Sequence, residues 1–343
     1  EYIPGPGSVL YGSNAVMGVV NIVTRHASHL PGLNARFTLG SGEERGLAFT
    51  WGGQLGPARV LLGAAHQAAR GNDRLYFAEY DSPATNGGIA QGRDGGRGDK
   101  LFAKARWDDF TLSAQWSERS KDDPTASFGA LFNTHSVSTD RFAFANLSYA
   151  RPVGDSHEVF ARVGLAHYRY DGFALYEGSS VPVPAASIGA ATWASGELRY
   201  VWSGWDGHRL LLGAEFQNNF RQSLWSADLE PAPFVYTDTR LHSSRWSLFV
   251  NDEWQIWPGL RLNLGLRGDR RLDGQATTTP RVAAAWSPIP GWTFKAQQGR
   301  AFREPNVSEL QNPDNPAYPS AALKVESTRS RELSALWQPS PDM

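Results

Sequence analysis

From about Pro31 onward, the chain alternates apolar and polar residues with a period of two, as β-strands with two different faces do. The alternation is clearest in the segment Leu260, Leu262, Leu264 and Leu266, and it recurs in Leu210, Leu212, Ala214, Phe216 and Phe220. These segments run to about 10–14 residues, whereas an average soluble strand has ~5–6 residues and a tilted strand that crosses a bilayer needs ~9–11. Long strands with one apolar face are therefore expected over most of the chain.

The connections between these segments alternate in length. Short turns are expected at Gly56-Pro57, Asp108-Asp109, 152–155, 204–207, Pro258-Gly259, 288–291 and 339–342. Long polar loops are expected near 71–98, 119–139, 171–190, 222–243 and 302–325. This arrangement predicts about fourteen strands joined as consecutive hairpins, with short turns at one end and long loops at the other.

Two architectures fit an alternating pattern, because periodicity alone does not show which face is outside. A soluble β-sandwich or barrel, such as a carbohydrate-binding protein, buries the apolar face. An outer-membrane barrel turns it to lipid and places aromatic girdles at the interfaces. Tryptophan gathers beside the short turns, at positions 107, 202, 205, 254, 257, 286, 292 and 337. Because an indole prefers the membrane interface, we predict an all-β, up-and-down antiparallel transmembrane β-barrel. Asp252 is the exception on the apolar face, and a bulge or an interfacial position would accommodate it.

Composition excludes several classes of protein. The chain has no cysteine, which removes disulfides, thiolate metal sites and cysteine nucleophiles. A formal net charge of −1 gives no reason to expect nucleic acid. No stretch approaches the ~18 apolar residues of a transmembrane helix. The eight histidines show no recognisable nucleophile context, so no enzyme, cofactor or metal site is predicted.

The first thirty residues differ from the alternating region. The stretch from Gly5 to Arg25 combines a Gly-Pro turn, small residues and a β-branched segment at Val19–Thr24. It closely resembles the end of the plug domain of TonB-dependent outer-membrane receptors, whose pattern is RGP-x-S-x-LYG-x-x-A-x-x-GVINI-x-T. The family motif residues here are Gly5, Pro6, Tyr11, Gly12, Gly18 and Asn21.

A second resemblance to this family comes late in the chain. The run from Gly299 to Leu310 carries Phe302, Arg303, Pro305 and Glu309, and resembles the family's GxxFRAPxxxEL segment. The stretch 323–327 is similar to the family's NPxLKPExS segment. Three positions depart from these patterns: Pro4 replaces an Arg expected to pair with barrel carboxylates, Glu304 replaces a small residue, and Val325 replaces a Pro.

The resemblance implies a division into residues 1–30, the C-terminal part of a plug domain, and residues 31–343, part of a transmembrane barrel. Such transporters have ~22 strands around a plugged lumen, so we expect a piece of a longer protein, with sheet edges near Leu33–Gly40 and Glu326–Trp337. The plug, rather than an ordinary barrel strand, is expected to contain Val19–Thr24. Pairing of that stretch in the barrel would instead favour a passive porin.

The resemblance also implies a receptor in the outer membrane of a Gram-negative bacterium, a monomer at full length. Its ligand would be scarce, most often a ferric siderophore, a cobalamin or another metal chelate. Haem is disfavoured, because haem receptors of this family carry a His between the two late motifs and residues 302–327 contain none. The partners implied are outer-membrane lipid, the small-molecule ligand and an inner-membrane energy-coupling complex that contacts an N-terminal box outside this sequence.

Two sets of residues follow from these expectations. The polar strand face predicts a lumen lining of Arg209, Glu215, Arg221, Arg261 and Arg267. Ligand contacts are expected from plug residues Tyr11, Ser13 and Asn14 and from loop aromatics Tyr76, Tyr80, Trp225 and Tyr236. The plug residues could equally well serve only to form a turn. The loop aromatics could equally well anchor the barrel at the membrane interface.

Overall fold

The computed structural model describes residues 1–5, 7–272, 274–310 and 323–338. Within these residues, one antiparallel sheet of 14 strands contains every strand from β3 to β18 except the small hairpin β6–β7. Each strand pairs with its sequence neighbour, β5 pairs with β8, and β3 and β18 form the two edges. The predicted all-β, up-and-down topology is thereby confirmed, and the predicted edges are confirmed with it. No helix in these ranges is long and apolar enough to cross a membrane.

The strands of the large sheet are β3 Gly32–Gly40, β4 Glu44–Leu55, β5 Ala58–Ala69, β8 Gly96–Trp107, β9 Phe110–Asp122, β10 Val137–Val153, β11 His157–Tyr176, β12 Val183–Trp202, β13 His208–Asp228, β14 Phe234–Trp257, β15 Leu260–Arg271, β16 Ala276–Trp286, β17 Trp292–Arg303 and β18 Glu326–Trp337. The loop after β5 holds β6 Arg74–Tyr76, η2 Ala78–Tyr80, η3 Pro83–Gly88 and β7 Ile89–Gln91. The 3-10 turn η4 Ser127–Gly129 follows β9, and the helix α2 Val307–Leu310 follows β17.

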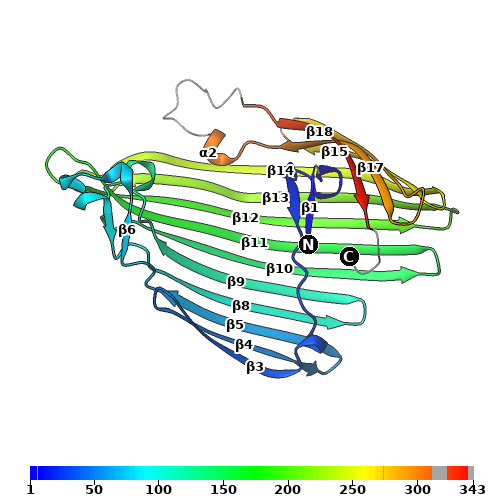
Figure 1. Cartoon of the computed structure of the whole chain (residues 1–343), viewed down its shortest axis with the longest axis horizontal. Helices are drawn as coiled ribbons and strands as arrows, with labels where there is room; N and C mark the ends of the chain where they lie inside the picture. Colours follow the sequence, from blue (N-terminus) through cyan, green and yellow to red (C-terminus); the bar gives the residue numbers. More distant parts are fainter. Residues whose placement is uncertain (6, 273, 311–322, 339–343) are drawn as a thin grey trace.

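The sheet curves as a wall, with the short turns at one end and the long connections at the other (Figure 1). Strands β11 to β14 have 20 to 24 residues, so they extend well beyond the expected length. The loops expected at 171–190 and 222–243 were therefore largely wrong, because both regions continue as paired strands. Their β-branched and aromatic residues, such as Val183, Phe234 and Val235, favour extended backbone. The short turn expected at 339–342 lies outside the described residues.

The two faces of the wall divide as the alternation predicted. Leu212, Phe216, Leu264 and Leu266 are exposed on the outer face, at 39% to 49% of their full accessible area. On the inner face Arg267 is fully buried. An apolar face open to the surroundings and a charged face covered by protein is the reverse of a soluble sandwich, and it fits a barrel in lipid.

Asp252 is accommodated on the outer face without a bulge. It pairs in register with Leu210 and Leu264, and its carboxylate contacts His208 Nδ1 at 2.7 Å. The His208 ring in turn stacks on Trp205 and Trp254, with centroids 4.6 and 5.1 Å apart. The acid is thus hydrogen-bonded to a partner within the tryptophan girdle at the short-turn end.

The first 31 residues form a separate segment inside the curve of the sheet (Figure 1). It contains β1 Tyr2–Pro4, the helix α1 Ser8–Tyr11, β2 Gly18–Val20 and the turn η1 Ala27–His29. Strands β1 and β2 pair with each other in a sheet of two and not with the wall. The pairing that would have favoured an open porin is therefore not what the structure has. We call residues 1–31 the N-terminal segment.

Candidate functional site: the inner wall and the N-terminal segment

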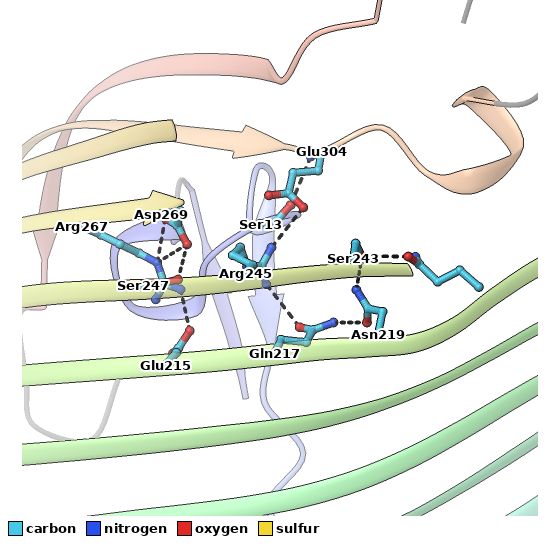
Figure 2. Close-up of polar contacts among 11 residues, drawn as sticks. Ser13, Glu215, Gln217, Asn219, Ser243, Arg245, Ser247, Arg267, Asp269 and Glu304 are labelled. Atoms are coloured by element: carbon cyan, nitrogen blue, oxygen red, sulfur yellow. Dashed lines mark hydrogen bonds and ion pairs between the residues drawn. The ribbon is translucent and has the colours of Figure 1, made fainter. Parts of the chain in front are cut away.

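The most deeply buried charge on the inner wall is Arg267 of β15. Its Nε donates to both carboxylate oxygens of Asp269 at 3.0 Å, and its Nη2 donates to Glu215 Oε2 at 2.5 Å (Figure 2). Ser247 Oγ donates to the same Asp269 carboxylate at 2.6 Å. One cation thus balances two carboxylates, so the group carries a formal excess of negative charge.

Two glycines leave room for this arginine. The Arg267 guanidinium lies 5.3 Å from the centroid of the Phe249 ring. The Phe249 ring occupies the space beside Gly213, where a Cβ would lie only 2.0 Å from the ring. Gly12, at the end of α1, has a φ of +71°, and a Cβ there would lie 3.0 Å from Arg267 Nη2. The N-terminal segment therefore contacts the buried arginine with bare backbone.

A second polar chain runs from the wall to Ser13. Arg245 of β14 donates to Gln217 Oε1 at 3.3 Å and contacts Glu304 Oε2 at 3.4 Å (Figure 2). The Glu304 backbone N–H then donates to Ser13 Oγ at 3.2 Å. Glu304, which stands where the family pattern has a small residue, therefore joins the wall to the N-terminal segment.

The end of β17 forms direct hydrogen bonds with the N-terminal segment. Ala301 and Phe302 are fully buried. The Phe302 backbone N–H donates to Ser8 Oγ at 3.3 Å, and its carbonyl accepts from the Asn14 N–H at 2.9 Å. Asn14 has a φ of +72°, which allows this turn to present its N–H to the strand. Ser8, Ser13 and Asn14 thus hold a turn against the late motif.

Loss of these hydroxyls is expected to weaken the seating of the segment. In the double variant Ser8→Ala, Ser13→Ala, the backbone N–H groups of Phe302 and Glu304 lose their acceptors, at about 1–3 kcal/mol for the buried Phe302 donor and less for the half-buried Glu304 donor. Urea titration in lipid vesicles should show this as a lower free energy of unfolding. Ser41→Ala, in an exposed turn, is the control; an equal effect there would contradict the role of these contacts.

Arg303, in the late motif, ties three elements together. It donates to Glu309 of α2 at 2.9 and 3.0 Å and to Glu326 of β18 at 2.7 and 3.1 Å. Asn306 and Glu309 exchange hydrogen bonds at 2.8 and 2.9 Å, which caps α2. The Arg303 guanidinium, and then the Asn306 N–H, lower the pKa of the Glu309 carboxyl from its ordinary value of 4.5.

Acidification should therefore loosen this tie. Because the pKa of Glu309 is lower in the folded state, its stabilising contribution is complete above about pH 4.5 and is lost as the pH falls further. Limited proteolysis between β17 and β18 with an acid-active protease should accelerate below this pH. With a protease active at neutral pH, Glu309→Gln should be cleaved there faster than the parent protein. An acid-phase cleavage rate of the parent protein that follows only the activity of the protease on an unfolded standard would refute the expectation.

The other predicted lumen residues lie in two different places. Arg209 and Arg261 share the inner face with Arg267 and border a cavity of about 890 Å³ near the short turns, together with Glu253, Arg281, Lys295 and Glu332. Arg221 does not continue their alternation. The β12–β13 register shifts between Thr192 and Trp193, and Arg221 pairs with Thr192 beyond that shift. The bulge therefore turns Arg221 to the other face, which corrects its predicted place in the lumen lining.

The predicted loop aromatics lie at the long-loop end, in two groups. Tyr80 stacks on Phe132 at 4.3 Å and donates to the Thr125 carbonyl at 3.2 Å, while the exposed Tyr76 donates to Asp81 at 2.9 Å. Trp225 and Tyr236 instead belong to the long β13–β14 hairpin, where Tyr236 donates to Asp228 at 2.6 Å. The exposed Tyr11 lies at the end of α1. The structure does not bring all of these residues into one site.

The remaining motif residues shape the N-terminal segment. Gly18 has a φ of +156°, and a Cβ there would lie 2.7 Å from the Ile3 carbonyl oxygen. Asn21 donates to the Glu1 carboxylate at 2.7 Å. Gly5 faces Glu332, whose carboxylate accepts from Gln297 at 2.6 Å and Ser330 at 2.8 Å. Pro305 lies between β17 and α2, and Pro6 lies outside the described residues. Across the described ranges, no group of three or more His, Asp or Glu side chains is placed to hold a metal ion.

The wall consists of sequential hairpins with an apolar outer face and a charged inner face, and an internal segment lies against the inner face. This arrangement is that of an outer-membrane β-barrel whose interior is occupied. The family model described as "TonB dependent receptor-like, beta-barrel" matches residues 30–342. The chain belongs to the TonB-dependent receptor family, whose barrels lie in the outer membrane of Gram-negative bacteria.

Curated relatives and solved structures agree with this assignment. The chain is 24% identical over 350 residues to the iron-regulated outer membrane virulence protein of Vibrio cholerae, covering 98% of this chain and 50% of that protein. It is 25% identical to the vitamin B12 transporter of the same species, covering 97% and 51%. The chain thus spans about half the length of the curated relatives it matches.

Two solved structures share its fold. The ferric enterobactin receptor of Pseudomonas aeruginosa, solved as a point mutant, superimposes with a TM-score of 0.73 at 18% identity, covering 98% of this chain and 55% of that one. A copper transporter superimposes with a TM-score of 0.76 at 17% identity, covering 98% and 56%.

Proposed function

We propose that the protein takes up a scarce metal chelate, most specifically a ferric siderophore, by TonB-dependent active transport. In this proposal residues 1–30 are the end of a plug domain and residues 31–343 form barrel wall. The observation that carries the proposal is the seat of the N-terminal segment, which lies inside the sheet and is bound to residues 302–304 instead of pairing with the wall. A passive porin needs no such internal segment.

The names of the relatives support an iron chelate over other cargoes. An iron-regulated protein and ferric enterobactin and siderophore receptors are among them, beside a vitamin B12 transporter and a copper transporter. Cobalamin is therefore the second candidate. The absence of His from residues 302–327 argues against haem.

The receptor itself performs no covalent chemistry in this proposal. Energy comes from an inner-membrane complex that pulls on the plug through an N-terminal box, and the plug then leaves or rearranges. The contacts that must yield include three neutral hydrogen bonds: Ser8 and Ser13 accept from the backbone of Phe302 and Glu304, and the Asn14 N–H donates to the Phe302 carbonyl. Each such bond contributes only about 0.5–1.5 kcal/mol net, so a modest force releases them in sequence.

A ligand entering from the long-loop end meets Tyr76 and Tyr80 first and the turn at Tyr11, Ser13 and Asn14 last. Tyr80 is held by its stack on Phe132, which presents a fixed aromatic surface. Trp225 and Tyr236 on the β13–β14 hairpin are proposed as further contacts. Aromatic faces suit the planar rings of a catecholate or a corrin.

Growth of a deletion strain on single chelates tests the proposal. Under iron limitation, loss of the gene should abolish growth on at least one ferric siderophore, and uptake of that labelled chelate should stop when a protonophore is added. If the deletion abolished only growth that depends on cobalamin, cobalamin would be the ligand in place of a ferric siderophore, and the proposal of active transport would stand. Uptake that persists with the protonophore would refute active transport and favour a porin.

A further inference from the structure

Four arginines gather on the outer face of the last strands, above the apolar band. Arg270 follows Leu260 to Leu266 in the alternation of β15, Arg300 follows Phe294 and Ala296 in β17, and Arg329 and Arg331 precede Leu333 in β18. We call these residues the arginine patch. They lie on the face opposite to Arg267 and the N-terminal segment, so they take no part in the site described above.

The contacts of the arginine patch within the described part of the chain are to neutral groups. Arg331 Nε donates to Gln298 Oε1 at 3.0 Å, and Arg300 Nη1 donates to the Thr278 carbonyl at 3.5 Å. Arg300 and Arg329 are direct cross-strand partners. Like charges directly opposite each other destabilise a sheet, and the outer-face positions of the described strands β15 to β18 include no acidic residue. The protein thus leaves an excess of positive charge there.

The same face carries a balanced charge pattern on the earlier strands. There Arg141 contacts Glu118 at 2.6 Å and Asp171 at 2.5 Å, and Arg169 contacts Asp171 at 2.6 Å. His66 contacts Asp99 at 2.7 Å. These outer-face charges on β5 to β11 are therefore matched by opposite charges, whereas the described strands β15 to β18 offer the arginine patch no such match.

The height of the arginine patch indicates what neutralises it. Arg329 is eight residues from Trp337 along β18, about 26 Å of strand at ~3.3 Å per residue. At a tilt of ~35–45° this length rises about 19–22 Å against an apolar band of ~25 Å, and an extended arginine side chain covers the remaining few ångströms. Trp337 marks the interface at the short-turn end, so the guanidinium groups reach the opposite interface, where lipid headgroups lie.

We propose that the arginine patch binds the phosphate of a phosphorylated lipid headgroup in the outer leaflet. Arg300 and Arg329 supply two adjacent planar guanidinium groups, which suit bidentate contacts to phosphate oxygens. Arg331 and Arg270 add charge on either side, and the leucines below contact the acyl chains. This site is separate from the transported ligand and does not depend on which chelate is carried.

The first test uses protein extracted from the native outer membrane in mild detergent, with native mass spectrometry counting the phosphorylated lipid retained per protein. Arg300→Gln, Arg329→Gln should lower retention about tenfold or more. Arg300→Lys, Arg329→Lys keeps the charges and should retain most of the lipid. Arg169→Gln is the matched control, since it removes one outer-face charge that the protein already pairs. Unchanged retention in the glutamine variant, or an equal loss in the control, would overturn the proposal.

A second measurement needs no variant. Delipidated parent protein is reconstituted with the phosphorylated lipid, with the same lipid after enzymatic dephosphorylation, or with inorganic phosphate at the same concentration. Only the phosphorylated lipid should raise the thermal midpoint. An equal rise with the dephosphorylated lipid would show that acyl contacts suffice, and an equal rise with inorganic phosphate would show a free-anion site; each would overturn the lipid assignment.

Discussion

Replacing Arg267 with methionine is expected to destabilise the folded protein by about 3–5 kcal/mol, because it leaves the buried Asp269 carboxylate and the half-buried Glu215 carboxylate without their cation. Asp269 is 4% exposed and accepts two hydrogen bonds from Arg267, and Glu215 accepts a third. Methionine fills much of the volume but donates nothing. Urea titration in lipid vesicles should show the loss in the free energy of unfolding.

A triple variant separates lost charge from lost packing. Arg267→Met with Asp269→Asn and Glu215→Gln removes the unpaired charges and should recover a large part of the stability. Arg261→Met is the matched control, since Arg261 is exposed on the same face and strand and donates one hydrogen bond, to Gln255 at 2.7 Å. Arg261→Met should lower the free energy of unfolding by only about 0.5 kcal/mol. Equal losses at the two positions would contradict a special role for the buried cluster.

Arg267 also shows what the sequence makes predictable. Side chains alternate strictly between the two faces of a strand, so the leucines of β15 fix the inner position of Arg267. Alternation places Asp269 and Ser247 on the same inner face of their strands, so their position beside Arg267 was also predictable. Alternation fails where a strand gains a residue, as at the bulge before Arg221.

Contacts between distant segments follow from no local pattern. Ser13 and Glu304 are separated by 291 positions in the sequence, and only the curvature of the whole sheet brings them together. The motif resemblance identified both segments but not their contact. The lengths of β11 to β14 were missed for another reason: their outer ends mix apolar, polar and glycine residues without the regular alternation that marks a strand in lipid, although their backbones still pair.

Gly12→Ala is expected to unseat the N-terminal segment and open the lumen. The φ of +71° and ψ of −145° at Gly12 belong to a region that costs other residues about 1–3 kcal/mol. The added methyl group would also stand 3.0 Å from Arg267 Nη2 and 3.3 Å from its Cζ. Arg267 is fully buried and held by two carboxylates, so the segment must move instead.

Conductance in planar bilayers measures this opening directly. If the segment closes the lumen as proposed, Gly12→Ala should show ion-conducting events that are rare in the parent protein, and cells carrying it should admit bulky antibiotics. Gly32→Ala is the control: its φ is also +71°, but a Cβ there meets nothing within 4 Å. It carries a backbone penalty without the contact on Arg267, so it should stay closed. Equal conductance in both variants would assign the effect to backbone strain alone, and a closed Gly12→Ala channel would show that contact with Arg267 does not hold the segment in place.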